Sequence, residues 1–80
     1  MGTFFGLYRG VVMASKDPTR RGRIQVSVPE ILDEGYTAWA VLSVPLGGAA
    51  PAALPLGVQV WIEFEHGDPR FPVVTGLIVG

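Results

Sequence analysis

Four side chains that could bind a metal ion or act as acid and base lie close together near the C-terminus: Glu63, Glu65, His66 and Asp68. On an extended strand, alternate side chains share one face, which would place Glu63 and Glu65 about 7 Å apart. Two carboxylates at that distance suit a hard cation or a hydrolase. His66, however, would end the strand with its side chain on the opposite face.

The same stretch is also typical of a hairpin turn, and this interpretation explains more of its residues. Gly67 supplies a positive φ, Asp68 can bond to the local backbone, and Pro69 presets its own φ. Glu63 and Glu65 then form the hydrated side of a half-buried strand. We therefore predict a turn, with no catalytic residue, no metal site and no cofactor.

A second group with possible chemistry is basic, and it consists of Lys16, Arg20, Arg21 and Arg23. We favour a solvated turn for this group. The alternative is a single-stranded nucleic-acid-binding module in which Tyr8 or Trp39 stacks on bases. Because the net charge is −1, a general attraction to nucleic acid is not expected.

The composition predicts association with other protein chains. Eighty residues form one domain, residues 1–80, whose core stabilises it only marginally. The absence of cysteine removes disulfides and thiolate metal sites. Only 16% of residues are charged, against about 25% in ordinary soluble domains. No apolar run reaches the length of a membrane helix, so we expect no membrane partner.

Strand patterns account for most of the chain. The predicted strands span residues 7–15, 23–28, 39–44, 59–65 and 72–79. Alternation puts Ile24, Val26 and Val28 on one face, and it does the same for Val60, Ile62 and Phe64. The unbroken apolar run at 39–44 predicts cover on both faces. Five short strands with a long connection after the third predict an all-β fold, a small Greek-key barrel of the OB type, with an SH3-like barrel as the alternative.

Residues 45–57 contain three prolines, three glycines and no charge, which is unusual for a solvated loop. The segment is either a linker folded over its own core or a loop that becomes ordered against another subunit. For the second case we expect Leu54→Asp to break assembly and spare the fold. The candidate interface residues are Leu46, Ala49, Ala50, Ala53, Leu54 and Leu56, with Trp61 as a possible anchor.

Taken in order, these features resemble the OB-fold domain of baseplate hub and spike proteins of contractile-tailed phages. The same domain occurs in type VI secretion spike proteins and related contractile injection machines. The elements that carry the resemblance are Gly10-Val11, Asp17-Pro18, Gly22-Arg23, Pro29, Trp39, Gly57, Phe64-Glu65, Gly67-Asp68-Pro69 and Pro72-Val73-Val74-Thr75-Gly76.

The resemblance implies a non-catalytic structural protein that forms a homotrimer on the tail axis and contacts hub and spike or needle proteins. It also implies a location in the virion, at the tail tip or baseplate, after assembly in the bacterial host cytoplasm. Larger relatives continue into a lysozyme domain or a β-helical spike, whereas this sequence ends at Gly80. We therefore expect either a stand-alone hub component or a fragment.

Overall fold

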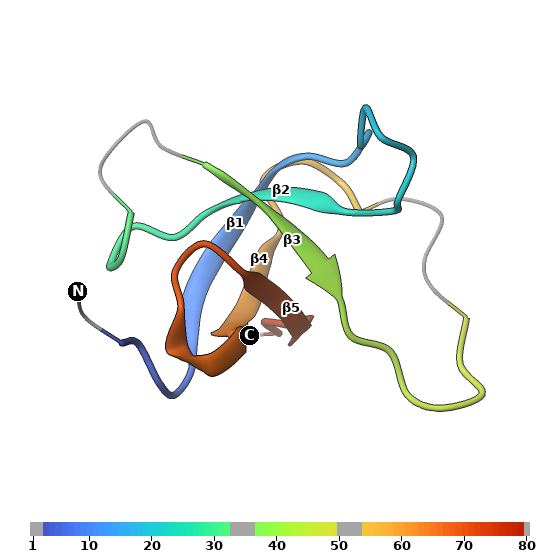
Figure 1. Cartoon of the computed structure of the whole chain (residues 1–80). Helices are drawn as coiled ribbons and strands as arrows, with labels where there is room; N and C mark the ends of the chain where they lie inside the picture. Colours follow the sequence, from blue (N-terminus) through green and yellow to red (C-terminus); the bar gives the residue numbers. More distant parts are fainter. Residues whose placement is uncertain (1–2, 33–36, 50–53, 80) are drawn as a thin grey trace.

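The computed structural model describes residues 3–32, 37–49 and 54–79 and contains five strands in those ranges (Figure 1). Each strand lies where the sequence predicts it, with ends that differ by up to two residues. A short 3-10 turn, η1 (Glu65–Gly67), follows the fourth strand. The strands are β1 (Tyr8–Ala14), β2 (Ile24–Ser27), β3 (Ala38–Leu42), β4 (Gln59–Phe64) and β5 (Pro72–Leu77).

The strands close into a barrel in the order β1-β2-β3-β5-β4. β1 has a paired strand on each side, because Val11 pairs with Ser27 of β2 and with Gln59 of β4. A register shift in β1 between Val12 and Ala14 accompanies this change of partner. β3 and β5 form the one parallel pair among the described strands, whereas the other pairs are antiparallel. This connectivity confirms the predicted OB-type barrel.

The core follows the alternation of the strands. Val26 and Val28 are fully buried, as are Val60 and Ile62, while their sequence neighbours point outwards. Each of these strands therefore has one face buried in the core and one face turned towards solvent, as predicted. The full set of buried hydrophobic residues is Val12, Ile24, Val26, Val28, Ala40, Val60, Ile62, Phe64 and Val74.

The prediction that residues 39–44 are covered on both faces is wrong. Ala40 is buried, but Val41 has 44% of its surface exposed and Val44 is exposed as well. The described residues include no helix that packs on the outside of β3, so its outer face lies open. The apolar run therefore reflects an uncovered surface of the single chain.

Strand directions sort the connecting segments to the two ends of the barrel. Residues 15–23, 43–49 and 54–58 lie at one end, which we call the β1–β2 loop end. Residues 3–7, 28–32 and 65–71 lie at the other, the β4–β5 loop end (Figure 1). Within the described ranges, no helix is long and apolar enough to cross a membrane.

Candidate protein interface

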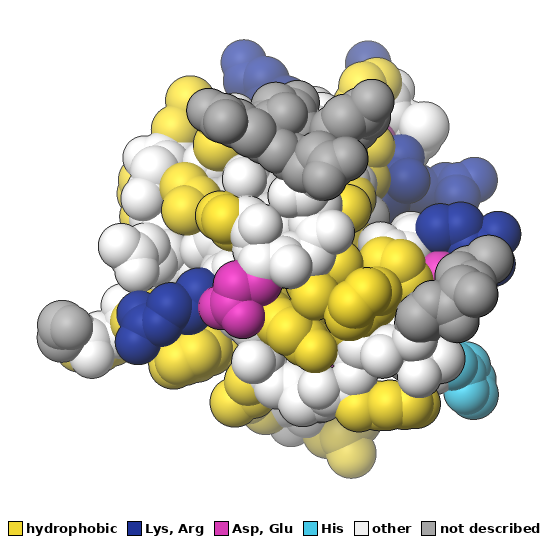
Figure 2. All heavy atoms as spheres, turned by 90° about the vertical axis from the view of Figure 1, so that its left-hand side faces the viewer, with side chains coloured by type: hydrophobic (Ala, Val, Ile, Leu, Met, Phe, Trp, Pro, Cys, Tyr) yellow, Lys and Arg dark blue, Asp and Glu magenta, His cyan; other side chains and the backbone are white. Residues whose placement is uncertain are grey.

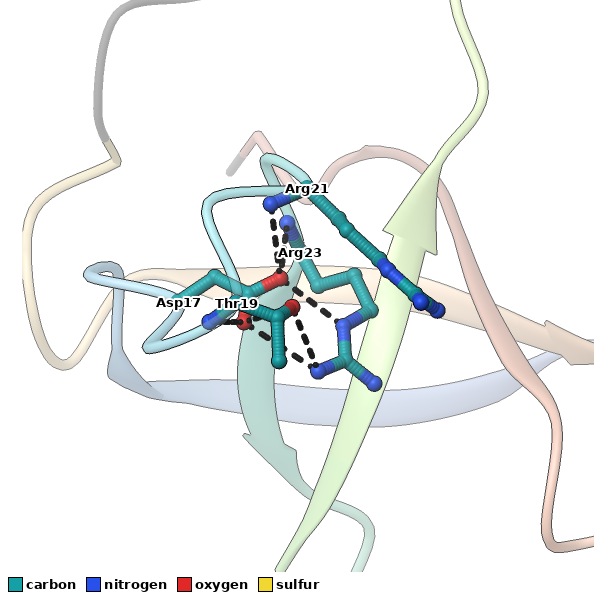
Figure 3. Close-up of polar contacts among 4 residues, drawn as sticks. All are labelled: Asp17, Thr19, Arg21 and Arg23. Carbon is teal, nitrogen blue, oxygen red and sulfur yellow. Dashed lines mark hydrogen bonds and ion pairs between the residues drawn. The ribbon is translucent and has the colours of Figure 1, made fainter.

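The β1–β2 loop is organised around the carboxylate of Asp17 (Figure 3). This group accepts hydrogen bonds from the backbone N–H of Thr19 at 2.8 Å and from the backbone N–H groups of Arg21 and Arg23 at 3.3 Å. The Thr19 hydroxyl donates to it at 2.7 Å. The Arg23 guanidinium adds two more hydrogen bonds, from Nε at 2.8 Å and from Nη2 at 3.1 Å. One carboxylate thus closes the whole turn.

The ion pair at this loop is shielded from water. The Asp17 side chain is only 2% exposed, and the Arg23 side chain is 26% exposed. The hydrogen bonds from Arg23, and to a lesser extent those from Thr19, hold the pKa of Asp17 well below its ordinary value of 3.8. Arg23 also lies 5.5 Å from the centre of the Trp39 ring on β3, so the loop is tied to the barrel wall.

The prediction of a solvated basic turn holds for three residues and is wrong for the fourth. Lys16, Arg20 and Arg21 are exposed, whereas Arg23 is half-buried and is the partner of Asp17. The turn residues behave as predicted, because Gly22 has a φ of +74° and Pro18 is exposed in the loop. The Asp-to-Arg spacing of six residues could have signalled the pairing, but spacing alone does not specify which arginine turns back.

The β4–β5 loop is the predicted turn. Gly67 has a φ of +70°, and the Asp68 carboxylate accepts a hydrogen bond from the backbone N–H of Arg70 at 2.9 Å. Arg70 also pairs with Asp68 through its side chain at 2.7 Å, which holds the pKa of that carboxyl below its ordinary value. Gly67 accepts a hydrogen bond from the Phe4 backbone N–H at 2.7 Å and is buried beneath the N-terminal segment. Pro69 is half-buried beside it.

The four possible metal ligands do not form a site. β4 ends at Phe64, so Glu65 lies in η1 and no longer continues the strand face that carries Glu63. Asp68 is already engaged by Arg70. Among the described residues, no three His, Asp or Glu side chains come together as a possible metal centre. Glu65, His66, Asp68 and Phe71 instead line an open hollow of about 300 Å³.

Tyr8 and Trp39, the candidates for base stacking, contact other side chains of the protein, and so does Trp61. The guanidinium carbon of Arg9 lies 5.0 Å from the centre of the Trp61 ring. That of Arg23 lies 5.5 Å from the centre of the Trp39 ring. Tyr8 packs against Phe64 at 5.6 Å between ring centres. Each tryptophan therefore has one ring face covered by a guanidinium, which weakens the case for a nucleic-acid groove.

Trp61 is half-buried on β4 and lies across Gly76 of β5, its partner in the strand register. A β-carbon on Gly76 would make ordinary van der Waals contact with the indole, at 4.0 Å from Cδ1. The indole thus covers a glycine on the barrel wall. There is room for a β-carbon at residue 76, so this packing does not itself require glycine there. The half-buried Trp61 is more a wall residue than a protruding anchor.

The predicted interface residues of the 45–57 segment separate into three groups. Leu46 and Ala49 are exposed, and Leu56 is 67% exposed. Leu54 is half-buried and packs against the core, so the prediction that Leu54→Asp would spare the fold is not supported. Ala50 and Ala53 lie outside the described residues.

Sequence reasoning missed many exposed apolar residues outside this segment. The described residues include ten large hydrophobic side chains that are exposed, against nine hydrophobic residues in the core. For exposed apolar residues on strands, such as Met13, the alternation of inward and outward positions could have indicated that the side chain faces outwards. Those not predicted are Phe5, Leu7, Met13, Val41, Val44, Phe71, Leu77 and Val79.

These apolar side chains lie beside hollows in the surface. Met13, Lys16 and Leu56 contribute to a hollow of about 250 Å³ at the β1–β2 loop end. A second, of about 180 Å³, is lined by Val44, Leu54 and Leu77 among others, where β3 and β5 diverge. Figure 2, which faces the β4–β5 loop end, shows hydrophobic side chains gathered near the centre, with Lys and Arg side chains towards the edges.

The closed barrel and its strand order define a small OB-fold domain, a class in which the surface and loops carry the binding function. The model of the type VI secretion system/phage-baseplate injector OB domain matches residues 8–78, and the chain belongs to this family. The match extends from β1 through β5 and confirms the resemblance seen in the motifs. No protein of curated function matches the sequence.

Membership in this family assigns the chain a structural role related to the baseplate of a phage tail or a type VI injector. The family is one of structural baseplate domains, which agrees with a surface rich in exposed apolar side chains. Two loops ordered by hydrogen bonds and many exposed apolar side chains are features that suit contact with other proteins.

Proposed function

We propose that the chain is an oligomeric OB-fold component of an injector tail tip, a homotrimer on the tail axis that connects hub proteins to spike or needle proteins. Family membership supports the baseplate setting. The trimer, the hub and spike contacts and the location in a virion are parts of this proposal. So is a non-enzymatic role, because the family is structural.

The observation that carries the proposal is the balance of exposed and buried apolar residues. Ten large hydrophobic side chains are exposed in the described part of the chain, and nine hydrophobic residues form the core. Burying one large apolar side chain stabilises by about 1.5–3 kcal/mol. Association that covers several of them would therefore add stability comparable with that of the small core itself.

A connecting role needs two contact surfaces, and apolar residues are present at both ends of the barrel. Leu46 and Leu56 are exposed in the segment at the β1–β2 loop end. Phe5 and Phe71 are 70% and 50% exposed at the β4–β5 loop end. Two such ends suit a subunit placed between a hub and a spike.

The test is incorporation into injector particles purified from the phage or bacterium that encodes the chain. Leu46→Glu should remove the protein from the particles while its melting temperature stays unchanged, because Leu46 is exposed. Thr75→Glu on the exposed wall of β5 adds the same charge and should leave incorporation intact. A Leu46→Glu protein that incorporates normally, or wild-type particles that lack the chain, would contradict the proposal.

A further inference from the structure

The two ends of the barrel carry opposite charge. At the β1–β2 loop end, four basic residues against the single acidic Asp17 give a formal charge of +3. At the β4–β5 loop end, the described residues Glu30, Glu65 and Asp68 against Arg70 give −2. Arg9 and Glu63 lie on strands between the loops and offset each other. A chain with a net charge of only −1 is therefore polarised along the barrel.

Apolar residues accompany these charges at both ends. Met13 and Leu56 line the hollow beside Lys16 at the basic end. Phe71 lines the hollow beside Glu65 and Asp68 at the acidic end. An apolar centre with a charged rim is the usual arrangement of a protein interface, and here the two rims have opposite signs.

We propose that copies of this chain contact each other through unlike ends, with the basic β1–β2 loop end of one copy against the acidic β4–β5 loop end of the next. The inference rests on the proposed function in taking the exposed apolar residues as buried in an assembly. A contact between unlike surfaces closes into a ring when its rotation allows, and otherwise continues as an open stack. A cyclic trimer needs a contact of this unlike kind.

The backbone of the basic end is preorganised for such a contact. Asp17 bonds to the backbone on both sides of the loop tip, and Arg23 ties the loop to Trp39. Arg20 has a φ of +59° within this closed turn, and its side chain and that of Arg21 are exposed. Docking would therefore order side chains but little backbone, which lowers its entropic cost.

The experiment reverses the charges at one end at a time and measures mass by light scattering and sedimentation. Lys16→Glu with Arg21→Glu brings the formal charge of the described residues at the basic end from +3 to −1, and Glu30→Lys with Glu65→Lys brings that of the described residues at the acidic end from −2 to +2. We expect each double variant alone to associate about a hundredfold more weakly than the wild type, because like charges then meet. An equimolar mixture of the two should regain association as mixed pairs or open stacks, since each supplies the end that the other lacks. A ring of three cannot alternate the two variants, so the mixture is not expected to restore a closed trimer.

Two controls separate this contact from general charge effects and from misfolding. The quadruple variant keeps the wild-type net charge, with end charges of −1 and +2 over the described residues where the wild type has +3 and −2, and it should associate more tightly than either double variant alone. Arg9→Glu with Glu63→Lys on the barrel wall should change nothing at the ends. Wild-type association should also weaken between about 10 mM and 1 M salt, as the Debye length falls from about 30 Å to 3 Å.

Several outcomes would overturn the inference. A wild-type protein that stays monomeric at low salt has no such contact. A trimer whose mass is unchanged by the end variants has a different interface, which would leave the proposed function standing and remove only this inference. Failure of the mixture to associate while each variant folds normally would also refute it. Incorporation into particles, measured separately, reports on the proposed function alone.

Discussion

Gly10 on β1 and Ile62 on β4 lie so close that a β-carbon at residue 10 would sit 2.7 Å from Cγ1 of Ile62. The Ser27 carbonyl oxygen would be 3.2 Å away on the other side. Ile62 is fully buried and cannot swing into solvent. The glycine therefore lets β1 approach both of its neighbours where the barrel closes.

We predict that Gly10→Ala destabilises the protein by about 1–3 kcal/mol through overpacking. In the Gly10→Ala, Ile62→Ala double variant the loss should be smaller than the sum of the single losses, because alanine lacks the Cγ1 atom that a β-carbon at residue 10 would meet at 2.7 Å. Gly76→Ala is the matched control: its β-carbon would meet Trp61 at an ordinary 4.0 Å and should cost little. Chemical denaturation measures the wild type, the two single variants, the double variant and the control, and strict additivity would disprove the steric explanation.

Asp17→Asn should lower the melting temperature by several degrees at neutral pH. The amide keeps the shape of the side chain but cannot accept the charged Arg23 hydrogen bonds in the same way. Calorimetry checks the change. Asp68→Asn is the comparison, because the Asp68–Arg70 pair is more exposed to water and should matter less.

The same carboxylate predicts a pH dependence of stability. The pKa of Asp17 is depressed in the folded state from an ordinary value of 3.8. Its contribution is therefore complete above that value and is lost as the pH falls below about 4 towards the folded-state pKa. The wild type should lose melting temperature more steeply than Asp17→Asn between about pH 5 and pH 2. Parallel curves would show that the pair contributes nothing.

Leu54 and Leu46 should respond differently to truncation although both belong to the apolar 45–57 segment. Leu54→Ala should destabilise the fold by about 1 kcal/mol, because Leu54 is half-buried against the core. Leu46→Ala should leave stability unchanged, since that side chain is fully exposed. Urea titration of both variants tests this difference, and equal losses would contradict the assignment of Leu46 to the surface.

Single-stranded oligonucleotides should not bind at micromolar concentrations, even at low salt. Arg23 is paired with Asp17, and a guanidinium already covers one face of each tryptophan ring. Fluorescence anisotropy with a labelled oligonucleotide provides the measurement. Salt-sensitive binding that disappears in Arg20→Gln with Arg21→Gln would instead support the nucleic-acid alternative.

Calcium, magnesium, manganese and zinc should leave the melting temperature unchanged. A ligand that binds the folded state must raise its stability. Asp68 is held by Arg70, and the described residues form no group of three metal-binding side chains. A concentration-dependent rise that Glu65→Gln removes would refute this prediction.

The sequence alone determined the strands and the turns, because these depend on local chemistry. Side chains alternate along a strand, so the inward positions of Ile24 and Val26, and of Val60 and Ile62, could be read directly. Gly22 and Gly67 marked the positive φ angles of the two loops. The ordered motifs also led to the family that the comparison confirmed.

Only the tertiary structure decided which segments meet. Leu54 packs against the core, whereas Leu46 is exposed to solvent. Both are leucines of one apolar segment, so hydrophobicity could not distinguish them, and the path of the chain over the barrel decides. Likewise, Arg23 pairs with Asp17 because the folded loop brings them together. Residue 10 must be glycine because barrel closure brings β1 against Ile62. The opposite charges of the two ends follow from strand direction, because the antiparallel and parallel pairings place residues 15–23 and 65–71 at opposite ends of the barrel.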